Sequence, residues 1–108
     1  MTYHPASSPY FWEQTADACF AQERWQKAAD AYLRLIELTP GNAGAWQKRG
    51  LALQHLGRLP DAADCLEHAL LLCPDTIETL QPLADILGAL KDTDRQTACL
   101  IRLGELRE

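Results

Sequence analysis

The sequence predicts an all-α fold, an α-solenoid built from three stacked helical pairs with six to seven helices in all. Two observations predict it. The first is a 34-residue spacing that leads from Trp12 to Trp46 and from Pro40 to Pro74. The second is that apolar residues inside each 34-residue unit recur at i, i+4 and i+7, which is one face of an α-helix. A repeat of this length is typical of proteins whose units stack side by side.

The three units are predicted at residues 9–42, 43–76 and 77–108, as one domain over residues 9–108, and residues 1–8 are expected to be a loose N-terminal tail. In the first unit, Ser8 is a candidate N-cap and Pro9 suits the first helical position. Each unit should contain two helices. Pro40 and Pro74 mark the ends of the first two units, because proline cannot continue a helix.

In the second unit, Asn42 is a candidate N-cap, Gly57 is expected to end the first helix and Pro60 to begin the second. In the third unit, Asp75 and Glu78 form a pair similar to a capping box. Small residues at equivalent positions should let the helices of a pair approach closely, and large apolar residues should fill the remaining space. The small set is Ala16, Gly50, Ala84, Ala28 and Ala62, and the large set includes Trp12, Trp46, Tyr32, Leu66, Leu100 and Leu103.

This pattern resembles the tetratricopeptide repeat (TPR), whose 34-residue motif combines W-x2-L-G-x2-Y with later Ala, aromatic and Pro positions. The second unit resembles it through Trp46, Gly50, Ala62, Ala69 and Pro74. The resemblance implies a right-handed solenoid and a non-enzymatic protein that binds other proteins. Three positions depart from the motif. Arg49 replaces Leu, Pro82 should kink or delay the first helix of the third unit, and Gln96 replaces a small Ala, which predicts looser packing.

The resemblance places the binding groove on the first helices of the units, which line a concave face. A helical wheel displaced from the core stripe selects the predicted partner-binding residues: Tyr10, Glu13, Asp17, Phe20, Gln47, Lys48, Leu51, Gln54, His55, Glu78, Gln81 and Asp85. The best-known peptide-binding subclass of the family grips a C-terminal carboxylate with Lys, Asn and Arg. By this resemblance, Glu13 and Asp17 occupy the positions at which that subclass has Lys and Asn. We therefore expect the partner to be a basic peptide or an amphipathic helix instead. A solvated acidic face without a ligand is the alternative.

Composition excludes several other functions. A net charge of −5 disfavours nucleic-acid binding, and no segment has the length and apolar character of a membrane span. The four cysteines, Cys19, Cys65, Cys73 and Cys99, lie in apolar helical patterns and are expected to be reduced and buried, in a cytoplasmic protein. A metal site could be drawn from Cys65, His68, Cys73 and His55, but these residues do not have the sequence spacing that is typical of metal ligands. We therefore predict no catalytic residue, no cofactor and no metal.

Two alternatives to a peptide-binding groove remain open. One is a small secretion or assembly chaperone that shields an aggregation-prone client, because small acidic proteins of this kind resemble the TPR chaperones of type III secretion. The other is homo-oligomerisation, in the simplest case a homodimer, through the ends of the solenoid. Ala98, Ile101 and Leu106 cannot all point inward together with Leu100 and Leu103, so an apolar stripe should remain on the last helix.

Overall fold

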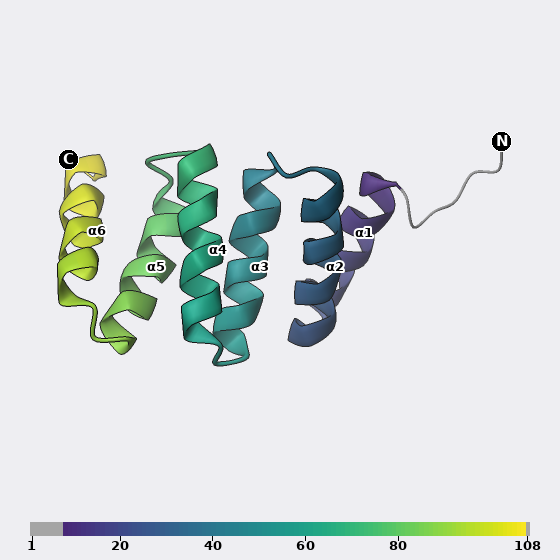
Figure 1. Ribbon diagram of the computed structural model, residues 1–108, viewed down its shortest axis with the longest axis horizontal. Coiled ribbons are helices and arrows are strands. Elements are labelled where there is room, and N and C mark those ends of the chain that lie inside the picture. The colour runs from purple at the N-terminus through teal and green to yellow at the C-terminus, as the bar shows by residue number, and fades with distance from the viewer. Residues whose placement is uncertain (1–7, 108) are drawn as a thin grey trace, which may run out of the picture.

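The computed structural model describes residues 8–107, and within this range the chain forms six α-helices and no β-strand. The helices lie side by side in one row, each antiparallel to the next, with α1 and α6 at opposite ends (Figure 1). This is the predicted α-solenoid. The helical pairs α1–α2, α3–α4 and α5–α6 are called repeats 1, 2 and 3. The bounds are α1 (Pro9–Ala21), α2 (Trp25–Leu38), α3 (Ala43–His55), α4 (Leu59–Leu72), α5 (Ile77–Ala89) and α6 (Thr93–Leu106).

The same left-handed turn joins the two helices of every repeat. Glu23, Gly57 and Lys91 follow one another at intervals of 34 residues and have φ values of 59°, 77° and 63°. In each turn the N–H of the next residue donates to a carbonyl of the preceding helix at 2.9 Å. Only Gly57 adopts this φ without a steric cost. The predicted glycine stop is therefore confirmed, and the other two turns carry residues that disfavour the conformation by about 1 kcal/mol each.

Small residues bring the helices of a repeat together, as predicted. Ala16, Ala28 and Ala62 are completely buried. Gly50 of α3 lies directly against α4, because a Cβ atom at this position would stand 2.8 Å from Leu66 Cγ and 3.2 Å from the Ala62 carbonyl oxygen. Any larger residue at position 50 would push the two helices of repeat 2 apart.

Repeat 3 reverses the sizes of two facing residues. Gln96 occupies the position held by Ala28 and Ala62 in the other repeats, and Gly88 faces it from α5. A Cβ atom at Gly88 would lie 2.4 Å from Gln96 Nε2, so the glutamine side chain uses the space that a side chain at position 88 would need. The exchange keeps the total volume similar, which is the kind of change that packed interiors tolerate best.

Arg49, which departs from the TPR motif, connects two neighbouring helices. Its Nε donates to the carbonyl oxygen of Ala29 in α2 at 3.3 Å, and its Nη1 donates to Sγ of the buried Cys65 in α4 at 3.2 Å. The core is therefore locally polar at this position. The guanidinium group thus finds an acceptor in each of the two helices that flank α3.

The structure confirms one of three predicted helix caps, shows no side-chain bond at the second and contradicts the third. The Asn42 side chain accepts a hydrogen bond from the Ala45 N–H at 3.1 Å, as predicted. Ser8 occupies the N-cap position of α1 but makes no side-chain capping bond. The capping pair of Asp75 and Glu78 was wrong, because Thr76 is the N-cap of α5. Asp75 has a left-handed φ of 64°, which turns it out of the capping position.

Two burial predictions were also wrong. Leu100 was expected in the core with Tyr32 and Leu66, but its exposed fraction is 49%, against 1% and 0% for those two residues. The physical reason is that a following helix covers Tyr32 and Leu66, whereas α6 is the last helix of the row (Figure 1). Of the four cysteines predicted to be buried, Cys73 is exposed at the C-cap of α4 and Cys19 is only half-buried, and all four are free thiols.

Two further predictions concern the ends of the chain and membranes. The predicted loose tail at residues 1–8 lies, apart from Ser8, outside the residues that the structure describes. Within the described range, no helix combines the length and apolar character that crossing a membrane requires.

Candidate functional site

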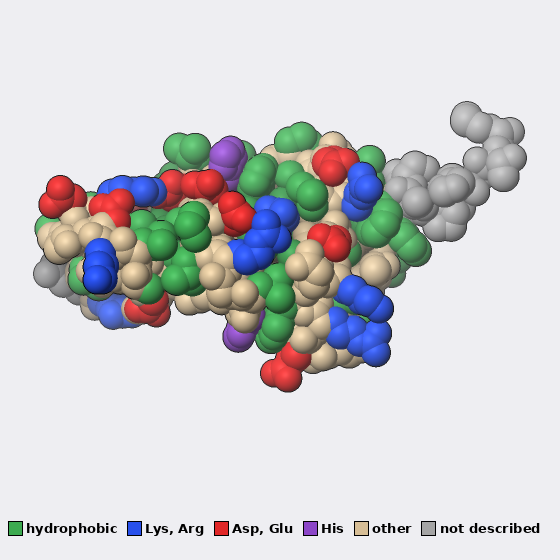
Figure 2. All heavy atoms as spheres, turned by 60° about the horizontal axis from the view of Figure 1, so that its bottom comes forward, with side chains coloured by type: hydrophobic (Ala, Val, Ile, Leu, Met, Phe, Trp, Pro, Cys, Tyr) green, Lys and Arg blue, Asp and Glu red, His purple; other side chains and the backbone are tan. Residues whose placement is uncertain are grey.

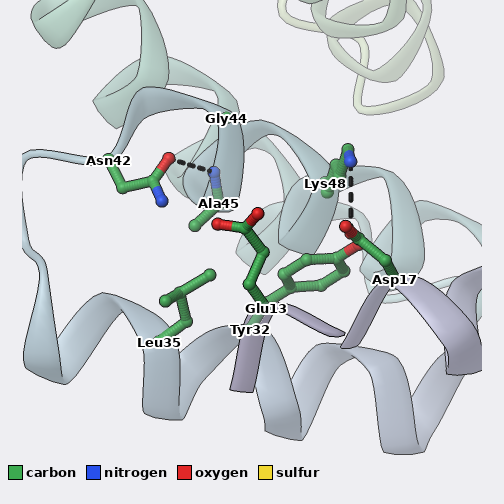
Figure 3. Close-up of a pocket in the computed structure, with 8 residues that line it drawn as sticks. All are labelled: Glu13, Asp17, Tyr32, Leu35, Asn42, Gly44, Ala45 and Lys48. Carbon is green, nitrogen blue, oxygen red and sulfur yellow. Dashed lines mark hydrogen bonds and ion pairs between the residues drawn. The ribbon is translucent and has the colours of Figure 1, made fainter. Parts of the chain in front are cut away.

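A pocket of about 210 Å³ opens between repeats 1 and 2. It is formed by side chains of α1, α2 and the start of α3, and Figure 3 shows Glu13 and Asp17 of α1 beside Tyr32 and Leu35 of α2. Its floor combines an aromatic ring with an aliphatic side chain, and its rim carries charged groups. The residues that line it are Glu13, Asp17, Tyr32, Leu35, Asn42, Gly44, Ala45 and Lys48.

Asp17 is the best-connected residue of the pocket. It accepts a hydrogen bond from the Tyr32 hydroxyl at 2.6 Å and another from Lys48 Nζ at 3.1 Å, both through Oδ1. The second contact is an ion pair between repeat 1 and repeat 2. Burial of Tyr32, followed by its hydrogen bond to Asp17 and the negative charge of that carboxylate, raises the pKa of the tyrosine far above its ordinary value. Tyr32 is therefore held as a neutral hydrogen-bond donor.

Glu13 differs from Asp17 in having no compensating partner. Its side chain rises from α1 between Tyr32 and Leu35, and its carboxylate points toward the start of α3 (Figure 3). It forms no hydrogen bond or ion pair with any other residue in the described part of the chain. The nearest cation of the pocket, Lys48, is engaged by Asp17. The pocket thus presents one carboxylate whose charge is not balanced by a neighbouring side chain.

Farther along the predicted groove, several selected residues bind one another. Gln47 donates from Nε2 to the Glu78 carbonyl oxygen at 3.1 Å and borders a smaller pocket of about 130 Å³ between repeats 2 and 3. Gln81 donates to Asp85 at 3.5 Å and accepts from Arg107 of α6 at 2.9 Å. These side chains connect helices as well as facing the predicted groove.

The aromatic residues at the opposite end of the helices form a packed cluster. Phe20 contacts Trp25 and Tyr32 edge to face, with ring centroids 5.1 and 6.3 Å apart. Trp25 stacks on His55 of repeat 2 at 3.9 Å, nearly parallel. The stack of Trp25 on His55 therefore joins repeats 1 and 2, whereas the contacts of Phe20 lie within repeat 1. Trp25 is half-buried, and Tyr10 is 71% exposed at the start of α1.

The remaining predicted groove residues, Leu51 and Gln54, are half-buried on α3. The predicted groove residues leave out five of the residues that form the pocket. The prediction considered one stripe of the first helices only, so it passed over α2, the loop before α3 and the other side of α3. The five residues are Tyr32, Leu35, Asn42, Gly44 and Ala45. Tyr32 carried a usable signal, since it is the one core position of its repeat set with a hydroxyl group, and a buried hydroxyl requires a partner.

The surface is not uniformly acidic, although the chain as a whole is. On the face seen in Figure 2, acidic and basic side chains alternate with apolar ones along the row of helices. The local balance at the pocket, with two carboxylates and one lysine, therefore matters more for recognition than the net charge.

The residues considered for metal binding do not come together. Within the described range, no group of three or more His, Cys, Asp or Glu side chains could hold a metal ion. His68 stacks on Trp46 with ring centroids 4.3 Å apart, and His55 stacks on Trp25. Burial raises the pKa of the Cys65 thiol, and the contact with Arg49 offsets this only in part. A thiol with a raised pKa is a poor nucleophile and a poor metal ligand.

Three stacked helical pairs with a polar pocket between repeats define an α-solenoid scaffold. Comparison with protein families makes the assignment specific: the model described as "Tetratricopeptide repeat" matches residues 17–102. Because this match spans most of the chain, the protein belongs to the TPR family. Membership of this family confirms the predicted fold. Because the family consists of non-catalytic scaffolds for protein interactions, it also identifies the chain as a protein–protein interaction module.

Individual relatives agree with this assignment. The sequence is 29% identical over 79 residues to sperm-associated antigen 1 of Mus musculus, a match that covers 73% of this chain but only 9% of that protein. The TPR2B domain of yeast Sti1, in a complex with pHsp70, superimposes with a TM-score of 0.83 at 20% identity, covering 91% of this chain and 78% of that one. MamA gives a TM-score of 0.87 at 22% identity, covering 94% and 60%. At these identities the two structures support the fold alone.

Proposed function

We propose that the inner face of repeats 1 and 2 binds an extended or helical segment of a partner protein, and that Glu13 contacts a basic side chain of this segment. The observation that supports the proposal most directly is the contrast between two neighbouring carboxylates. Asp17 is engaged by Tyr32 and Lys48, whereas Glu13 stands in the same pocket without a partner among the described residues.

The shape of the pocket fits a lysine or arginine side chain. Its floor includes the Tyr32 ring and Leu35, which can contact the aliphatic stem of such a side chain, and Glu13 can accept a hydrogen bond from the charged end. A volume of about 210 Å³ is smaller than a typical drug-sized ligand site. It suits one side chain of a peptide whose remaining residues lie along α1 and α3.

The surrounding contacts support binding by a preformed site. The ion pair between Asp17 and Lys48 and the stacking of Trp25 on His55 join repeats 1 and 2 on two sides. A scaffold that is already ordered loses little conformational entropy on binding. The yeast Sti1 domain with the same fold is seen with pHsp70, which supports a protein as the partner class here.

The proposal can be tested without knowing the natural partner, by selecting binders from a random peptide library displayed on phage. We expect the selected peptides to share a lysine or arginine, and their affinity to fall as the salt concentration rises. Glu13→Lys should weaken the binding of these peptides by about tenfold or more, because it replaces an attractive charge contact with a repulsive one.

The matched control is Asp64→Lys, which changes the net charge by the same amount at an exposed position of α4 outside the pocket. It should leave peptide binding within about twofold of the original value. Selected peptides that are acidic, or that bind the Glu13→Lys variant as tightly as the original chain, would contradict the proposal. So would a library from which no peptide binds the protein. The more specific role of a secretion or assembly chaperone stays a prediction from the sequence.

A further inference from the structure

The smaller pocket, between repeats 2 and 3, is the equivalent of the first pocket one repeat further along the chain. Its volume is about 130 Å³, against about 210 Å³ for the first. The two are called the repeat 1–2 pocket and the repeat 2–3 pocket, and both lie at junctions inside the row of helices. Four of their lining residues correspond at the 34-residue interval: Glu13 with Gln47, Leu35 with Ala69, Asn42 with Thr76, and Ala45 with Thr79.

The repeat 2–3 pocket differs in that none of the described residues lining it is charged. Gln47 stands in the place of Glu13, and its amide already donates to the Glu78 carbonyl oxygen at 3.1 Å. Thr76 donates from Oγ1 to the Cys73 carbonyl oxygen at 3.0 Å. A small pocket without a charged group fits a small uncharged side chain, such as that of alanine or valine. The rest of its lining is formed by Ala43, Gly44, Ala69, Cys73 and Thr79.

Gly44, near the start of α3, borders both pockets, and Figure 3 shows it beside the first. Its two equivalents, Tyr10 in α1 and Glu78 in α5, carry exposed side chains. A Cβ atom at Gly44 would meet only Asn42 Oδ1 among the described residues, at 3.4 Å, which is an ordinary contact. Helix packing therefore does not require a glycine at this position. The effect of the glycine is that no side chain at position 44 separates the two pockets.

We propose that one extended segment of the partner protein occupies both pockets and that its backbone crosses α3 over Gly44. A lysine or arginine of the segment enters the repeat 1–2 pocket, and a small uncharged side chain enters the repeat 2–3 pocket. This inference rests on the proposed function and specifies the partner further. The shared border at Gly44 supports it, because a short stretch of chain can reach both pockets without passing around a side chain.

The separation of the two pockets sets the spacing of the two anchoring residues. The first turn of α3 lies between the pockets, and an α-helix with its side chains is about 10–12 Å across. An extended chain advances about 3.3 Å per residue. We expect the basic residue and the small residue to stand about two to four positions apart. Their order along the segment should be the same in every peptide that binds.

The first test examines the peptides selected by phage display on the original chain. In addition to a lysine or arginine, they should share a small uncharged residue about two to four positions away. Synthetic copies with glycine in place of that residue should still bind, since the contact with Glu13 remains, but about three- to tenfold more weakly. Peptides that share only the basic residue would overturn the proposal. So would a spacing of about seven residues, which is the spacing that a helical segment would need.

The second test uses Cys73 as a direct probe of the repeat 2–3 pocket, because this exposed cysteine lines it. Cys19 is half-buried and lines neither pocket, so it serves as the internal control. A saturating peptide should slow the alkylation of Cys73 by iodoacetamide about fivefold or more, and that of Cys19 by less than about twofold. Mass spectrometry of the digested protein measures both rates. The glycine-substituted peptide, also at saturation, should protect Cys73 about half as much or less.

The third test changes the crossing point with Gly44→Tyr. Tyrosine is the residue at the equivalent position 10, where its side chain is 71% exposed, so α3 should still form. The variant should bind the selected peptides about tenfold more weakly, because the new side chain stands where the segment crosses. Gly44→Ala is the matched control, and it should leave the affinity within about twofold because its Cβ makes only an ordinary contact. Circular dichroism should show the same helix content in both variants.

These outcomes distinguish the two-pocket contact from the proposed function on which it rests. Peptides that need Glu13 but leave Cys73 alkylation unchanged would overturn the two-pocket contact alone, as would peptides that bind Gly44→Tyr as tightly as the original chain. Equal slowing of Cys19 and Cys73 would also overturn it, since it would show a general loss of access for the reagent. Peptides that bind independently of Glu13, or a library without any binder, would overturn both proposals.

Discussion

The side-chain amide of Gln47 in α3 donates a hydrogen bond to the backbone carbonyl oxygen of Glu78 in α5, at 3.1 Å. Pro82 lies four residues after Glu78 inside the same helix. Proline has no N–H, so it cannot make the helical hydrogen bond to this carbonyl. Gln47 thus supplies from repeat 2 a donor that α5 lacks, and α5 continues as a helix to Ala89.

Gln47→Ala should therefore destabilise the protein by about 0.5–1.5 kcal/mol, the usual net value of one hydrogen bond. The relationship with Pro82 makes the prediction specific. Pro82→Ala introduces a backbone N–H that can bond the Glu78 carbonyl, so in that background Gln47→Ala should cost measurably less. Urea unfolding of the two single variants and the double variant gives the coupling energy. Equal costs in both backgrounds would show that Gln47 does not compensate for the proline.

The left-handed turns predict a gain in stability. Lys91 has a φ of 63° at the position where repeat 2 uses Gly57. Lys91→Gly should stabilise the protein by about 0.5–1 kcal/mol, because glycine adopts this conformation without a clash, although its greater freedom in the unfolded chain reduces the gain. The reverse change, Gly57→Ala, should cost a similar amount. Thermal melting should show shifts of a few degrees in opposite directions; shifts in the same direction would contradict this explanation.

Gly50 and Gly104 should respond oppositely to the same substitution. A Cβ atom at Gly50 would approach Leu66 Cγ to 2.8 Å, and Leu66 is completely buried and cannot move aside cheaply. Gly50→Ala should therefore destabilise the protein by about 1–3 kcal/mol. At Gly104 nothing lies within 4 Å, so Gly104→Ala should stabilise by about 0.5 kcal/mol through helix propensity alone. Denaturant unfolding measures both, and a stabilising Gly50→Ala would contradict the close approach of α3 and α4.

The repeat architecture could be predicted from the sequence because its signals are local and periodic. Trp12 and Trp46, 34 residues apart, established the period, and Gly57 marked one turn through its own residue type. The equivalent turns at Glu23 and Lys91 carry no such signal, because neither residue type favours a positive φ. The prediction that Leu100 is buried was wrong for a different reason. Its burial depends on whether another helix follows, and periodicity within one helix contains no information about that neighbour.

The candidate site could be predicted only in part. The helical wheel selected Glu13, Asp17 and Lys48, and the structure places all three around one pocket. It could not show that Asp17 and Lys48 neutralise each other, because they lie 31 residues apart and their contact depends on how repeats 1 and 2 stack. For the same reason the sequence treated Gln47 as a free groove residue. Whether the selected residues bind a partner stays a prediction.

An acid-dependent prediction follows from Asp75 and Arg102, which join the loop before α5 to α6. Arg102 Nε donates to Asp75 Oδ1 at 2.6 Å, and this hydrogen bond, with the charge of the guanidinium, lowers the pKa of the carboxyl below its ordinary value of 3.8. A lowered pKa in the folded state contributes stability above pH 3.8, and this contribution is lost as the pH falls through the folded-state pKa. Carboxyl NMR titration should show the lowered pKa, and Arg102→Met should return it toward 3.8. An unchanged pKa in the variant would contradict the assignment.

An alkaline prediction follows from the buried Tyr32. Burial and the hydrogen bond to Asp17 raise the pKa of its hydroxyl far above the ordinary value of 10.0, so the folded state retains this proton while the unfolded state loses it. The resulting stability is complete below pH 10 and is lost as the pH rises beyond it. We expect tyrosinate absorbance to show that Tyr32 ionises only when the helical signal in circular dichroism is also lost.

Tyr32→Phe separates this effect from the titration of other groups at high pH. It removes the hydroxyl but keeps the ring that packs against Phe20. At pH 7 it should cost about 1–3 kcal/mol, because the hydrogen bond to the charged Asp17 is lost. Above pH 10 the stability of the variant should decline less steeply than that of the original chain, since one proton fewer is released on unfolding. Parallel stability curves for the two proteins between pH 9 and pH 12, about one unit below to two units above the ordinary tyrosine pKa, would show that Tyr32 ionises freely in the folded state.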